Sequence, residues 1–99
     1  MSAHQVDEIV ERARQQLGLL EDVMAGLGDV SAEATSPCGH VRVRVDAGGG
    51  MVALHLAEAA SRLDATEVSA AILATAHEAA RIAAGKRDRL LSELRDSLG

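Results

Sequence analysis

The side chains with the clearest potential for chemistry are five basic residues near the end of the sequence. Between residues 81 and 95 these five stand against two acids, so this stretch has a local charge of +3 in a chain whose net charge is −5. The five are Arg81, Lys86, Arg87, Arg89 and Arg95. Cationic side chains can bind phosphate groups, whereas base-specific recognition requires an element that enters a groove of the nucleic acid. Two more cations, Arg12 and Arg14, lie in the first predicted helix and can join this basic cluster if the two helices pack side by side.

The basic cluster also has a simpler explanation. Cations near the C-terminus of a helix stabilise the helix dipole, and here they alternate with Asp88, Glu93 and Asp96, as on a solvated face. The overall acidity argues against a protein that coats nucleic acid by bulk charge, but the field at a phosphate is local, within a Debye length of about 8–10 Å. The residues alone leave phosphate binding and a solvated helix face both open.

The remaining reactive side chains do not form a recognisable site. Cys38 and His40 make a Cys-x-His pair, but structural zinc needs four ligands at recognisable spacings. The other histidines, His4, His55 and His77, are scattered along the sequence. His77 and Glu78 are adjacent, and no further group converges on them to shift a pKa or to exclude water. We therefore expect no catalytic residues, no metal and no cofactor.

The glycine run Gly48-Gly49-Gly50 is the only other motif with a known chemical use. Glycine-rich loops that cradle phosphates lead into the N-terminus of a helix, and a P-loop continues with Lys and Ser or Thr. Here the run leads into a predicted strand, and Met51 and Val52 follow it. We therefore interpret the run as a hairpin turn.

The composition narrows the classes of partner. None of the 99 residues is Phe, Tyr or Trp, which removes the aromatic platforms on which single-stranded nucleic acid stacks. No apolar run approaches the ~18 residues that a membrane span requires, so we expect no membrane partner. The single cysteine cannot form an intramolecular disulfide, and the first residues are charged where a signal peptide would be apolar. These features favour a cytoplasmic protein.

The hydrophobic periodicity predicts a single α+β domain over residues 1–99, with elements in the order α-β-β-β-α. Apolar residues recur every three or four positions from Val6 to Leu27, which indicates an amphipathic helix over about 4–27. The period then changes to two, which indicates strands, before a helical pattern returns. The strands are expected at about 30–36, 39–46 and 50–57, and the last helix at about 64–97. The short intervening turns favour an antiparallel meander.

The predicted sheet has a Val/Leu face and a polar face. Arg42 and Arg44 lie on the polar face, together with Glu33 and His55.

The predicted elements need more core than one chain supplies. The last helix would span about 50 Å at 1.5 Å per residue, whereas a compact chain of this length has a radius of gyration of about 13 Å. Of the hydrophobic residues, 19 are alanine and none is aromatic, which makes the core thin. The strand edges remain open, and the distal leucines need a partner surface: Leu90, Leu91, Leu94 and Leu98. We therefore expect a homodimer in which two chains complete one core.

Three stretches together resemble a known family. They are the amphipathic helix from Val6 to Leu27, the strand core Gly39-His-Val-Arg-Val-Arg-Val-Asp followed by Gly-Gly-Gly-Met-Val-Ala-Leu-His-Leu, and the helix Ala70-Ala-Ile-Leu-Ala-Thr-Ala-His-Glu-Ala-Ala-Arg. In this order they resemble the YbaB/EbfC family of small nucleoid-associated DNA-binding proteins. The resemblance covers nearly the whole chain.

The resemblance implies a tweezer-like homodimer whose helical arms bind double-stranded DNA with little or modest sequence preference. By location and charge, the implied DNA-binding residues are Arg12, Arg14, Arg81, Lys86, Arg87, Arg89 and Arg95. The implied cellular location is the nucleoid, in the cytoplasm of a bacterium. An alternative with the same fold is a dimeric adapter or chaperone-like protein whose arms hold a protein partner, because the chain is acidic overall and carries leucines at the end of its last helix.

Overall fold

The computed structural model describes residues 2–98 and has the predicted order of helix, three antiparallel strands and long helix. This confirms the fold class. The elements are α1 (Ala3–Gly28), β1 (Ala32–Thr35), β2 (Val41–Val45), β3 (Met51–Leu56), the short 3-10 helix η1 (Glu58–Arg62) and α2 (Ala65–Leu98).

The ends of α1 have clear local causes. Ser2 and Gln5 form a reciprocal cap: the backbone N–H of Gln5 donates to Ser2 Oγ at 3.3 Å, and the N–H of Ser2 donates to Gln5 Oε1 at 3.0 Å. At the other end the N–H of Val30 still donates to the carbonyl of Leu27, at 3.3 Å. Val30 therefore belongs to the exit from the helix, and β1 begins two residues after the expected position 30, at Ala32.

The sheet is a meander in the order β1-β2-β3, with both pairs antiparallel. The side chains of β2 alternate strictly: Val41, Val43 and Val45 are fully buried, and Arg42 and Arg44 are exposed. The valines face α2, so we call the opposite side, with Arg42 and Arg44, the outer sheet face. This alternation confirms the predicted polar face.

The glycine run forms the turn between β2 and β3, as interpreted. The carboxylate of Asp46 accepts hydrogen bonds from the backbone N–H groups of Gly48, at 3.0 Å, and Gly50, at 2.9 Å. Gly49 adopts φ +84°, in the left-handed region that favours glycine. The N–H groups that a phosphate would need therefore already hold a carboxylate of the protein itself.

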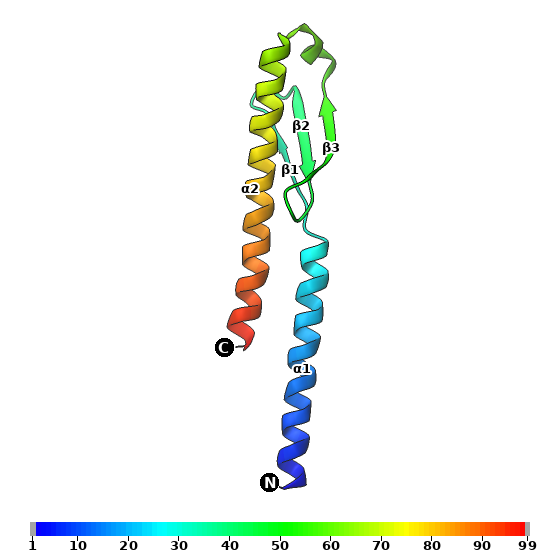
Figure 1. Cartoon of the computed structure of the whole chain (residues 1–99), viewed down its shortest axis with the longest axis vertical. Helices are drawn as coiled ribbons and strands as arrows, with labels where there is room; N and C mark the ends of the chain where they lie inside the picture. Colours follow the sequence, from blue (N-terminus) through cyan, green and yellow to red (C-terminus); the bar gives the residue numbers. More distant parts are fainter. Residues whose placement is uncertain (1, 99) are drawn as a thin grey trace.

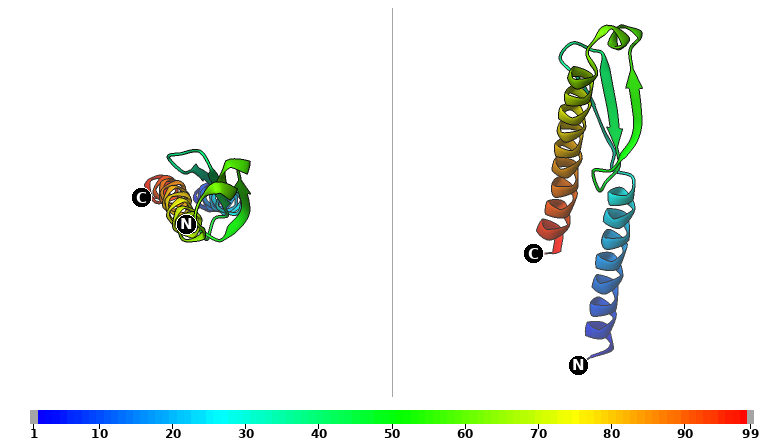
Figure 2. Two further views of the ribbon diagram at one scale, coloured as in Figure 1. Left: turned by 90° about the horizontal axis from the view of Figure 1, so that it is seen from above. Right: turned by 45° about the horizontal axis from the view of Figure 1, so that its top comes forward.

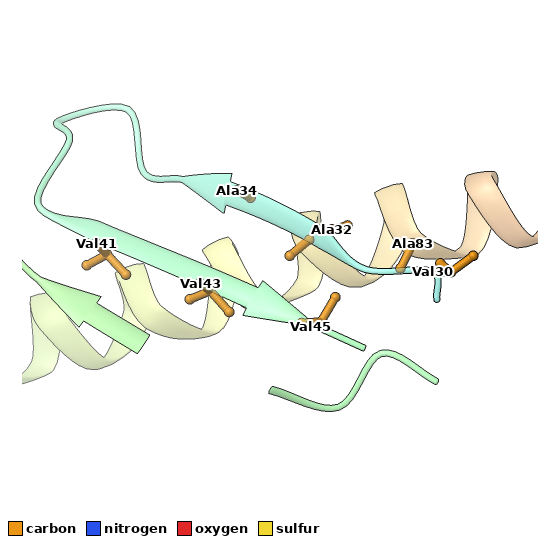
Figure 3. Close-up of a cluster of buried hydrophobic side chains, with 8 residues drawn as sticks. Val30, Ala32, Ala34, Val41, Val43, Val45 and Ala83 are labelled. Carbon is orange, nitrogen blue, oxygen red and sulfur yellow. The ribbon is translucent and has the colours of Figure 1, made fainter. Parts of the chain in front are cut away.

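The hydrophobic core lies between α2 and the first two strands (Figure 3). Ala79 and Ala83 are fully buried against the β2 valines, and their small side chains let the helix approach the sheet closely. No aromatic residue contributes, so the core is a thin layer of alanine and valine. It covers β1 and β2 only: all six residues of β3 are exposed.

The molecule is long and narrow, measuring 76 × 18 × 15 Å with a radius of gyration of 21.0 Å. Figures 1 and 2 show α2 extending past one end of the sheet toward its C-terminus, while α1 extends from this same end of the sheet and reaches further still. From Ala3 to Leu17 every residue of α1 is exposed. We call this exposed half of α1, and the part of α2 beyond the sheet, the two arms.

Candidate nucleic-acid interface

The seven predicted cations all lie on the two long helices, but they differ in what they already hold. Arg12 and Arg14 are exposed in the uncovered half of α1. The other five lie on the second half of α2 and are exposed, except for Arg87, which is partly buried.

Two of the cations bind backbone carbonyls far away in the sequence. Lys86 Nζ donates to the carbonyl oxygen of Ser31 at 2.7 Å, and Arg87 Nη1 donates to that of Ala47 at 2.8 Å. Ser31 lies in the link between α1 and β1, and Ala47 lies in the turn between β2 and β3. Lys86 therefore ties the link between α1 and β1 to α2, and Arg87 ties the turn between β2 and β3 to the same helix.

A third cation is paired within α2. Arg81 donates to both carboxylate oxygens of Glu78, Nη2 to Oε1 at 2.6 Å and Nε to Oε2 at 3.0 Å. This bidentate contact lowers the pKa of the Glu78 carboxyl and raises that of the Arg81 guanidinium. Arg81 therefore carries its positive charge next to a negative one.

The remaining four cations are the most available to a ligand. Within residues 2–98, Arg12, Arg14 and Arg89 have no ion pair or hydrogen-bond partner for their side chains. Arg95 lies 3.9 Å from a carboxylate oxygen of Asp96, with both side chains 78% exposed, a geometry that contributes little. Each arm thus carries exposed guanidinium groups, the side chain best suited to phosphate.

The single chain does not gather all these cations at one place. α1 meets α2 near its own C-terminal end, where Gly26 approaches Leu90 and where Lys86 and Arg89 line a shallow groove. Arg14 lies 12 residues before Gly26, which is about 18 Å along a helix. α2 runs in the opposite direction to α1 (Figure 1), so Arg95, five residues beyond Leu90, covers about 8 Å of this distance. Arg12 and Arg14 therefore lie further along the molecule than the α2 cations, rather than beside Lys86 and Arg89.

The outer sheet face forms a second basic surface that the sequence prediction did not count as a site. Arg42 is opposite His55, and Arg44 is opposite both Glu33 and Ala53. These residues line a shallow depression of about 220 Å³. The signal in the sequence was two arginines two positions apart on a predicted strand, which places both on one face.

The Cys38–His40 pair lies in the turn between β1 and β2. Within the described residues no three His, Cys, Asp or Glu side chains are placed to hold a metal ion. Cys38 is exposed, and Ser36 Oγ lies 3.4 Å from its Sγ; this hydrogen bond lowers the pKa of the Cys38 thiol. No helix in residues 2–98 has the length and apolar character needed to cross a membrane.

These features define a small α+β protein in which two long helices extend as arms from a three-stranded sheet and carry exposed arginines. The chain belongs to the YbaB/EbfC DNA-binding family, whose model matches residues 2–98. This confirms the resemblance found in the sequence and supports a DNA-binding, nucleoid-associated role.

The fold is similar to that of a solved structure. The uncharacterized protein HP0035 from Helicobacter pylori superposes with a TM-score of 0.60 at 17% sequence identity, over 100% of this chain and 99% of that one. At this identity the likeness concerns the fold alone. No curated protein sequence matches the chain.

Proposed function

We propose that the protein is a homodimeric nucleoid-associated protein that binds double-stranded DNA through phosphate contacts made by its arms, with little or modest sequence preference. The observation that carries this proposal is the set of exposed arginines without strong intramolecular partners on the two arms, Arg12, Arg14, Arg89 and Arg95, in a chain of a DNA-binding family. Such contacts position a protein on the duplex without reading its bases. DNA as the ligand also implies a nucleoid, and hence cytoplasmic, location.

The cations of the basic cluster have different roles in this proposal. Arg89 and Arg95 supply phosphate contacts from α2. Lys86 and Arg87 hold backbone carbonyls and set the position of the arm, while Arg81 is partly neutralised by Glu78.

The proposed dimer follows from β3. This strand is exposed on both faces, and its other edge has no partner strand among the described residues. Leu54 and Leu56 are opposite the buried Val43 and Val41 and so share the face toward α2, but they are 44% and 43% exposed, because α2 covers only β1 and β2. An open edge beside uncovered leucines is a surface that a second copy can cover by strand pairing and helix packing.

DNA binding is tested by fluorescence anisotropy with a labelled duplex of about 30 base pairs, longer than the ~22 base pairs that a 76 Å molecule spans at 3.4 Å per base pair. We expect binding at low salt that weakens as salt rises. Arg89→Gln should weaken binding to all sequences alike and reduce the slope of log K against log salt by about 0.9 for each phosphate that the variant no longer neutralises.

Arg62→Gln is the matched control for Arg89→Gln, because it removes the same charge from η1, at the end of the molecule away from the arms (Figure 1). It should leave the slope unchanged. The absence of any anisotropy change at low salt with micromolar protein would refute the proposal.

A second candidate is an adapter that holds a protein partner. It is favoured by Leu91 and Leu98 on the arm of α2, which are 47% and 45% exposed. A pull-down from native lysate with and without nuclease separates the two functions, since partners bridged by nucleic acid disappear after nuclease treatment while a directly bound protein remains.

A further inference from the structure

We propose that the outer sheet face is a second DNA-contacting surface, on which Arg42 and Arg44 bind backbone phosphates of the duplex. This inference rests on the proposed function, because it assigns a further surface to the same ligand. It assigns part of the contact with DNA to the sheet from which the two arms extend.

The geometry places two guanidinium groups side by side. Arg42 and Arg44 are two residues apart on the central strand, so both side chains leave the sheet on the same face, with their Cα atoms about 6.8 Å apart. β2 is paired on both sides, which fixes the position of these residues. They belong to the strand whose valines are fully buried, the most firmly packed part of the fold.

The charge of this face differs from that of the whole chain. Glu33 is its one acidic side chain among the paired strand residues, and it lies 3.5 Å from Arg42 Nε, with both side chains about half exposed. Arg44 has no ion pair or hydrogen bond of its side chain among residues 2–98. A bound anion offsets the repulsion between the neighbouring guanidinium groups of Arg42 and Arg44.

The shape of the face favours an extended polyanion over a small anion. The depression between these side chains is about 220 Å³ and is shallow and open to solvent. Pockets for small ligands are larger and enclose most of the ligand surface. A ligand here lies across an open surface, as a phosphate backbone does.

The position of the face also fits the arms. α1 continues beyond the sheet along the same long axis (Figure 1), so one duplex laid along the molecule can reach both the sheet and the first arm. The sheet and the first arm thus lie one after the other along the length of the molecule.

The experiment compares exposed charge variants with matched controls, using the same labelled duplex and the full chain. Arg44→Gln removes a cation from the outer sheet face and should weaken binding roughly three- to tenfold, with a salt slope reduced by about 0.9 for each phosphate left without its cation. Arg62→Gln removes the same charge from η1 and should have little effect.

Glu33→Gln changes binding in the opposite direction, so a folding defect cannot imitate its effect. It removes the acid of the outer sheet face and should tighten binding several-fold, whereas Glu58→Gln, in η1, should not. If Arg44→Gln weakens binding no more than Arg62→Gln, and Glu33→Gln tightens it no more than Glu58→Gln, the inference is overturned while the arm proposal stands. If the natural chain does not bind the duplex at all, both are overturned.

Discussion

Arg87 and Arg89 are two positions apart on α2, yet their surroundings give them different roles. Arg87 is partly buried and donates to the carbonyl of Ala47, whereas Arg89 is exposed and holds no partner in the described part of the chain. A guanidinium that satisfies a half-buried carbonyl contributes to stability, and one that faces solvent is available to a ligand. Equal charge in the sequence therefore does not mean equal function.

We predict that Arg87→Gln lowers the free energy of unfolding by about 1–2 kcal/mol, because it removes a charged donor and leaves the Ala47 carbonyl without its partner. The salt slope of DNA binding should stay the same. Arg89→Gln should instead leave the free energy of unfolding unchanged and reduce the salt slope. Urea unfolding and anisotropy on both variants provide the measurement, and a reduced salt slope for Arg87→Gln would show that Arg87 contacts phosphate after all.

Sequence reasoning found these cations but could not distinguish them. The partners of Lys86 and Arg87 are 55 and 40 residues away along the chain. Local periodicity shows only which residues share a face of one helix, so a contact with a distant backbone carbonyl is invisible to it. The sheet arginines were placed on the correct face for the opposite reason: alternation is a local property of one strand.

At the scale of the elements, the two hairpin turns each use a glycine at positive φ. Gly39 has φ +78°, and a Cβ added there would have no neighbour within 4 Å, whereas Gly49 has φ +84° and an added Cβ would lie 3.4 Å from Ala80 Cβ on α2. The first turn therefore needs glycine for its backbone alone. The second needs it also because the turn lies close against the long helix.

We predict that Gly39→Ala costs about 1 kcal/mol of stability, the ordinary penalty of an L side chain in the left-handed region. Gly49→Ala should cost more, because the added methyl also meets Ala80. Both variants introduce the same side chain, so the difference between their losses of unfolding free energy in urea measures the effect of the contact between the turn and α2. Equal losses would mean that the turn shifts enough to accommodate the methyl group without disturbing α2.

The order of the elements could be predicted because both helices and all three strands have clear hydrophobic periods. The exposure of β3 could not be predicted from the sequence. Its pattern, with Val52, Leu54 and Leu56 on one face, is that of a half-buried strand. Whether this face is covered depends on where α2 crosses the sheet, and in the single chain α2 packs over β1 and β2 only.

At the scale of the whole molecule, the single chain is longer and more exposed than a compact domain of its size. A radius of gyration of 21.0 Å is well above the ~13 Å of a compact chain of this size. Apolar side chains stay exposed along α1 as well as on β3, among them Ile9, Leu17 and Met24. These are the apolar surfaces that remain for the proposed dimer to cover.

We predict that sedimentation equilibrium finds a dimer at micromolar concentration and that the thermal midpoint rises with protein concentration, as mass action requires when folding and association are coupled. Leu54→Lys should shift the protein toward monomer, since it would place a charge in the proposed interface. Ala59→Lys, on exposed η1, is the matched control and should leave the dimer intact. A stable monomer at these concentrations would exclude the dimer.

The ties of Lys86 and Arg87 have a mechanical consequence. α1 is a stiff rod of 26 residues joined to the sheet through the short link that contains Ser31. A load applied near its free end, such as the pull of a bound polymer, acts with the leverage of about 39 Å of helix on that link. Lys86 holds this link close to the place where Gly26 of α1 packs against Leu90 of α2, so the torque on the arm is resisted by this ammonium–carbonyl hydrogen bond together with the contact between the two helices.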